Sequence, residues 1–105
     1  MIFGFLSSAK VDTFAKSMAE GVTRRYPPVI ANNPEQTVPP QRVSEILEIA
    51  YSGASRFQQE SQLGLLGRAK LGNAFKWELR EIGYEERFVG LATEKLIEHL
   101  TGRTD

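Results

Sequence analysis

The sequence of 105 residues contains no cysteine and only one histidine, His99. The absence of cysteine excludes disulfides, thiolate metal sites and cysteine nucleophiles. Because there is one histidine, the two-histidine pattern of di-metal sites in helical bundles cannot be completed, and no second group with an ordinary pKa near neutrality is present to act with it. We therefore predict no catalytic, cofactor-binding or metal-binding residues in this chain.

The sequence also lacks an excess of charge of either sign. Lysine plus arginine number 13 and aspartate plus glutamate number 13, so the net charge is zero with His99 neutral. Proteins that bind nucleic acids usually carry a basic excess that neutralises phosphates. Nucleic acid is therefore a disfavoured partner, although a local basic patch stays open as an alternative. A net charge of zero gives weak self-repulsion, which permits self-association.

No hydrophobic run is long enough to cross a membrane. The apolar segment MIFGFL occupies residues 1–6, whereas a spanning helix needs about 20 residues. The segment also lacks the basic start and the small-residue cleavage site of a signal peptide. We predict no membrane span and a cytoplasmic location. We expect MIFGFL to pack against the body of the protein; the alternative is an interfacial anchor that inserts Phe3, Phe5 and Leu6 into lipid.

What the sequence does contain is helical periodicity. Over residues 43–57 the apolar residues recur at steps of three and four, so they form one stripe with polar residues on the other side. The members of this stripe are Val43, Ile46, Leu47, Ala50, Gly53, Ala54 and Phe57. Similar patterns predict four helices in all, over about residues 8–25, 41–60, 65–82 and 85–100. Ser7 or Ser8 is expected to cap the first of them, and Gly83 to end the third.

A proline-rich segment separates the first two predicted helices. Residues 27–40 hold all five prolines of the chain, and such segments are stiff and extended. We expect an ordered crossover that Val29, Ile30 and Val38 attach to the body; the alternative is an arm that docks on a partner. The predicted fold is all-α: a small, four-helix bundle-like single domain over residues 1–105, with this connector between helices one and two.

The third predicted helix has two apolar faces. One is the expected core stripe of Leu65, Leu71, Phe75, Leu79 and Ile82, and the other carries Leu66 and Trp77. On the fourth helix, Leu91 and Ile97 also lie off the main apolar face. Tryptophan is frequent at interface hot spots. We therefore interpret the protein as a non-enzymatic binding or assembly module that contacts a protein partner or a second copy through Leu66, Trp77, Leu91 and Ile97; burial of Trp77 in the core is the competing interpretation.

Two other functions stay open. Arg68, Lys76, Arg80 and Arg87 are candidates for phosphate contacts in a nucleic-acid-associated regulator. An enzyme whose site is not visible in the sequence is the second alternative, and a pocket around His99 would be its signature. Phosphate-loop chemistry is not supported, because Asn73 stands where the lysine of that motif belongs and no strand precedes it.

Overall fold

The computed structural model describes the backbone of residues 2–35 and 38–102, and side chains from Ala9 onward within those ranges. All regular structure in these ranges is helical, which confirms the predicted all-α class. The helices are α1 (Ile2–Arg25), α2 (Pro28–Ala31), α3 (Pro40–Ala50), α4 (Ala54–Glu60), α5 (Leu65–Ile82) and α6 (Glu86–Thr101). Within the same ranges, no helix has the length and apolar character needed to cross a membrane.

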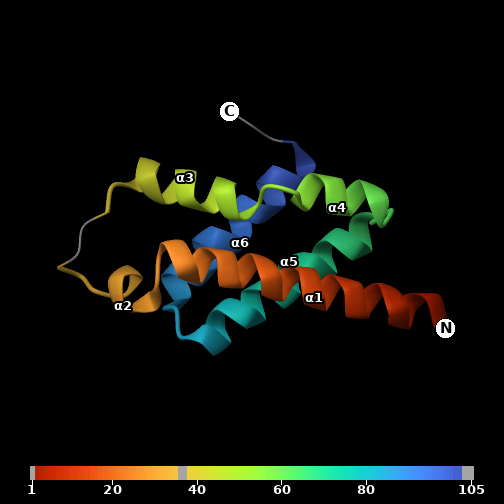
Figure 1. The fold of residues 1–105 in the computed structure, drawn as a ribbon, viewed down its shortest axis with the longest axis horizontal. Coiled ribbons are helices and arrows are strands. Elements are labelled where there is room, and N and C mark those ends of the chain that lie inside the picture. The colour runs from red at the N-terminus through yellow and green to blue at the C-terminus, as the bar shows by residue number, and fades with distance from the viewer. Residues whose placement is uncertain (1, 36–37, 103–105) are drawn as a thin grey trace.

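Four helical rods form the body: α1, the end-to-end pair α3 and α4, α5, and α6 (Figure 1). α5 packs against both α1 and α6, α3 packs against the same two helices, and α4 packs against α6. α1 runs opposite to α3 and α4, since Phe14 stacks on Phe57 whereas Gly21 faces Ala50. The arrangement fits the expected four-helix bundle-like fold.

The second rod is broken, contrary to the prediction of one helix over about residues 41–60. The helix stops at Ala50, and Gly53 takes a left-handed backbone conformation (φ 96°) before α4 begins. Tyr51, the residue that follows α3, is fully buried, and its hydroxyl donates a 2.6 Å hydrogen bond to the Ala92 carbonyl of α6. Gly53, expected in the apolar stripe, is exposed instead.

α1 is longer than predicted. It begins at Ile2 and passes through Ser7 and Ser8, so neither serine caps it. The residues between MIFGFL and Val11 contain no proline, and nothing local stops the helix from extending. The expectation that MIFGFL packs against the body, like its lipid-anchor alternative, concerns side chains outside the described residues.

The connector is not extended throughout, contrary to the prediction, because residues 28–31 form the one-turn helix α2. It fixes the turn between α5 and α6. The Asn32 amide donates a 2.9 Å hydrogen bond to the Gly83 carbonyl and accepts a 3.0 Å bond from the Glu85 backbone N–H. Ile30 and Val38 pack against the core as expected, but Val29 is 76% exposed. Asn32, rather than Val29, is therefore the residue of α2 and its flank that holds this corner.

The core combines the apolar faces of α1, α3, α5 and α6 with three buried tyrosines. Tyr84, after α5, donates a 2.6 Å hydrogen bond to the Tyr26 carbonyl at the end of α1, and both rings contact Phe88. Leu65, expected in the core stripe of α5, is 76% exposed, because it is the first residue of the helix and lies beyond the packed region.

A close approach joins α5 to α6 at Gly72. A Cβ atom built on this buried glycine would lie 3.0 Å from Cδ1 of Ile97 and 4.0 Å from Cγ2 of Thr93. Ile97 of α6 occupies the space that a side chain at position 72 would fill. Ile97 is consequently half-buried between the two helices.

Enlarging Gly72 should destabilise the fold. Gly72→Leu is expected to lower the free energy of unfolding by about 1–3 kcal/mol, because Ile97 must move or α5 and α6 must separate. Gly90→Ala is the matched control, since a Cβ on Gly90 of α6 meets no atom within 4 Å; it should raise the free energy of unfolding by about 0.5–1 kcal/mol. Urea unfolding measures both, and wild-type stability in Gly72→Leu would contradict the close approach.

The buried tyrosines should make stability depend on alkaline pH. Burial raises the pKa of Tyr51 and of Tyr84 above the ordinary value of 10.0, so the unfolded chain loses these protons before the folded chain does. Their contribution is therefore fully present below about pH 10 and is lost as the pH rises further. Urea unfolding at a series of pH values should show this decline, and Tyr51→Phe should make it shallower. If Tyr51 in the folded protein lost its proton with the ordinary pKa of tyrosine, that result would contradict its burial.

Candidate protein-binding surface

α5 presents one buried face and one exposed face. Leu71, Phe75 and Leu79 are fully buried against the neighbouring helices, whereas Leu66 and Trp77 on the other side are 77% and 53% exposed. The two sets separate because side chains turn by about 100° per residue. The sequence pattern of two apolar faces is thus present in the structure, and the second face is open to solvent.

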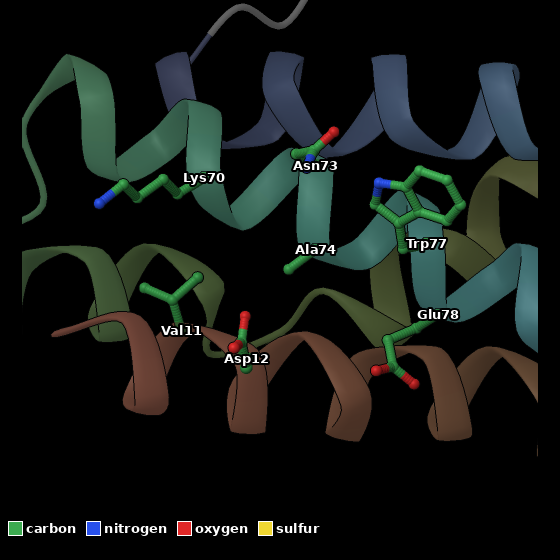
Figure 2. Close-up of a pocket in the computed structure, with 7 residues that line it drawn as sticks. All are labelled: Val11, Asp12, Lys70, Asn73, Ala74, Trp77 and Glu78. Atoms are coloured by element: carbon green, nitrogen blue, oxygen red, sulfur yellow. The ribbon is translucent and has the colours of Figure 1, made fainter. Parts of the chain in front are cut away.

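Trp77 borders a groove between α1 and α5, called here the Trp77 groove (Figure 2). Its volume is about 380 Å³, and its lining residues are Val11, Asp12, Lys70, Asn73, Ala74, Trp77 and Glu78. Val11 and Ala74 form an apolar floor where the two helices meet, and the indole of Trp77 stands beside it. An apolar floor with one large aromatic ring is the composition of a site that receives a side chain of a partner.

The charged residues of the Trp77 groove are two carboxylates and one amine. Asp12 comes from α1, and Glu78 and Lys70 come from α5. No ion pair within the described ranges engages any of the three. The carboxylates of Asp12 and Glu78 therefore favour a ligand that places cationic groups beside them.

Arg80 supports Trp77 rather than presenting a free positive charge. Its guanidinium lies 4.9 Å from the centre of the Trp77 ring, and it makes two hydrogen bonds of 2.7 and 2.8 Å to the Glu86 carboxylate of α6. These bonds lower the pKa of Glu86 and raise the pKa of Arg80. The bidentate pair fixes the guanidinium plane against the indole, which orients the ring.

The structure does not gather the four candidate phosphate-contacting residues into one patch. Arg80 is paired with Glu86, and Arg87 is exposed on α6. Arg68 is half-buried beside Leu100, and its Nε atom is buried. Lys76 is half-buried and lies near enough to Glu86 to interact electrostatically. A continuous row of free cations along a phosphate backbone is not formed.

The four candidate partner-contacting residues also separate. Leu66 and Trp77 share the outer face of α5, but Leu66 lies three turns before Trp77 and does not line the Trp77 groove. Ile97 fills the space over Gly72. Leu91 is 41% exposed and lies two residues before Thr93, about 160° around α6 from the side that faces α5. One partner surface therefore contains Trp77 alone of the four.

His99 lies against the core rather than in a polar cleft. Its ring packs edge-on against Tyr51, with ring centres 6.0 Å apart. No cluster of three or more His, Asp or Glu side chains able to hold a metal ion occurs in residues 2–35 and 38–102.

Sequence reasoning missed the partners of Trp77 and a second groove. Asp12 and Glu78 reach one site from helices about 60 positions apart, and no spacing rule connects them. Phe57, expected in the apolar stripe, and Phe14 of α1 are only half-buried. Their rings stack 4.3 Å apart beside a mainly apolar groove of about 480 Å³ between α1 and α4. The two aromatic residues are the only sign of this groove in the sequence, but helical periodicity by itself places them in the core.

The pairing of Arg80 with Glu86 can be measured directly. In a carboxyl-detected NMR titration, Glu86 should have a pKa below that of the other glutamates, because the guanidinium favours its ionised form. In Arg80→Gln this pKa should return to the ordinary range. An ordinary Glu86 pKa in the wild type would show that Arg80 is free and would strengthen the phosphate-binding alternative.

No protein family, curated protein or solved structure matches this chain. The only guides to its function are therefore its own residues: the half-exposed Trp77, the guanidinium that orients it, and the carboxylates of the groove beside it.

Proposed function

We propose that this protein is a non-enzymatic binding module that takes a helical segment of a partner protein in the Trp77 groove. The observation that supports this most is the position of Trp77. It is 53% exposed, its ring lies 4.9 Å from the Arg80 guanidinium, and it borders a groove between two helices that is also lined by Val11 and Ala74. A large aromatic ring kept in place in the unbound protein binds with little loss of conformational freedom.

The groove also indicates the chemistry of the partner segment. Val11, Ala74 and the indole favour an apolar side chain, and the unpaired carboxylates of Asp12 and Glu78 favour lysine or arginine next to it. An amphipathic helix with apolar residues on one face and a basic residue at its edge meets both requirements. An acidic segment or a nucleic acid would meet the carboxylates with like charge.

The alternative functions have weaker support. For nucleic acid, one of the four candidate cations, Arg80, is already bound to Glu86. For an enzyme, the single histidine packs edge-on against the buried Tyr51. Protein binding thus gives a role to the exposed Trp77 and to the carboxylates of the groove, whereas the other two functions give them none.

Trp77→Ala should weaken partner binding far more than it weakens folding. Loss of an interface anchor typically costs about 2 kcal/mol or more of binding free energy, which is roughly 30-fold in affinity. A half-exposed side chain contributes little to folding, so the free energy of unfolding should change by about 0.5 kcal/mol or less. Ile49→Ala is the matched control, because Ile49 is 52% exposed on α3.

The measurement is capture of partners by the purified full chain, followed by titration of each captured protein. Trp77 is the only tryptophan, so its emission reports occupancy of the groove directly. We expect a blue shift on binding, retained affinity in Ile49→Ala, and lower affinity in Trp77→Ala and, at low salt, in Asp12→Asn. A captured protein that leaves the Trp77 emission unchanged and binds Trp77→Ala normally would contradict the proposal, as would gross unfolding of Trp77→Ala.

A further inference from the structure

The end of the molecule at which α5 begins carries two highly exposed leucines. Leu65 and Leu66 are 76% and 77% exposed. They are the first two residues of α5 and follow Gly64, so no earlier helical turn covers them. The exposure of two adjacent leucines to water is unfavourable in an isolated protein. Because the start of the helix fixes their position, they are available for insertion into another apolar phase.

α1 begins at the same end (Figure 1). The sequence has no charged side chain before Lys10. The helical backbone from Ile2 therefore brings an uncharged stretch of chain to the end that already carries Leu65 and Leu66. The uncharged start of α1 and the two exposed leucines thus lie together at this end, whereas α2 and the turn between α5 and α6 lie at the opposite end.

Two exposed lysines flank this end. Lys10 borders the groove between α1 and α4, and Lys70 borders the Trp77 groove on the other side of α1. Figure 2 shows the Lys70 side chain extended along α5 toward the start of that helix. Neither lysine has an ion-pair partner in the described part of the chain, whereas Arg56 nearby is paired with Glu60 at 3.2 Å.

We propose that this end binds the surface of an anionic lipid bilayer, with Leu65 and Leu66 inserted at the boundary between headgroups and acyl chains. Lys10 and Lys70 then lie at the level of the headgroup phosphates. Exposed apolar side chains ringed by lysines are the composition of interfacial membrane contacts. An anionic surface attracts both unpaired lysines, which favours a bilayer as the occupant over a second copy of this chain, whose net charge is zero.

The test is co-sedimentation of the full chain with vesicles. We expect binding to vesicles of equimolar phosphatidylcholine and phosphatidylglycerol, weaker binding to phosphatidylcholine alone, and weaker binding at high salt. Leu65→Ser combined with Leu66→Ser should weaken binding by at least about tenfold. Lys10→Gln combined with Lys70→Gln should weaken it at low salt only. Val29→Ser is the matched control, since Val29 is 76% exposed at the opposite end, and it should bind normally.

Three results would overturn the proposal. They are absence of wild-type binding to the anionic vesicles, an equal loss in Val29→Ser, and a lipid-free dimer seen by sedimentation that the paired serine variant abolishes. Far-ultraviolet circular dichroism confirms that each variant is folded. Trp77→Ala should bind vesicles as the wild type does, so failure of this proposal is distinguishable from failure of protein binding in the Trp77 groove.

Discussion

The packing of α5 between α1 and α6 is the constraint on which the rest of the structure depends. Gly72 lets α6 come close enough for Ile97 to lie over it, while Leu71, Phe75 and Leu79 fill the space toward the core. With both flanks of α5 occupied, its remaining face has no neighbour within the domain. Trp77 is exposed for this reason, and the Trp77 groove exists because α1 meets α5 along only one edge of that face.

A few side-chain hydrogen bonds then fix the positions of the helix ends. The Tyr51 hydroxyl joins the break between α3 and α4 to α6, the Tyr84 hydroxyl joins the end of α5 to the end of α1, and Asn32 joins the connector to the turn between α5 and α6. Each of these side chains bonds to a backbone carbonyl or N–H, and the Tyr84 hydroxyl also makes a longer, 3.5 Å bond to Oγ1 of Thr23. Bonds to the backbone fix the position of a whole helix end, which apolar contacts alone leave free to slide.

Charge divides the surface into regions of different chemistry even though the chain is neutral overall. Arg80 and Glu86 neutralise each other beside Trp77, so the carboxylates of Asp12 and Glu78 dominate the groove next to it. Lys10 and Lys70 remain unpaired, within the described residues, around the apolar end. The two proposed contacts, a basic amphipathic helix in the groove and an anionic bilayer at the end, follow from this local separation rather than from net charge, which only bounds long-range effects.

The sequence by itself determined the helical class and several helix boundaries. Periods of three and four residues report a local geometry, and Pro27 and Gly83 act on their own backbone, so α1 ends at Arg25 and Gly83 caps α5 in the left-handed conformation as predicted. Tertiary structure decided the rest. The stripe over residues 43–57 reads as continuous, yet the helix stops at Ala50 and Gly53 is left-handed, while Tyr51 bonds to α6, a helix about 40 residues away. Periodicity likewise shows that Trp77 and Leu79 lie on different faces of α5, but only the positions of α1 and α6 decide which face is covered. The groove and the Arg80–Glu86 pair depend on contacts between helices, and the pattern within one helix carries no information about its neighbours.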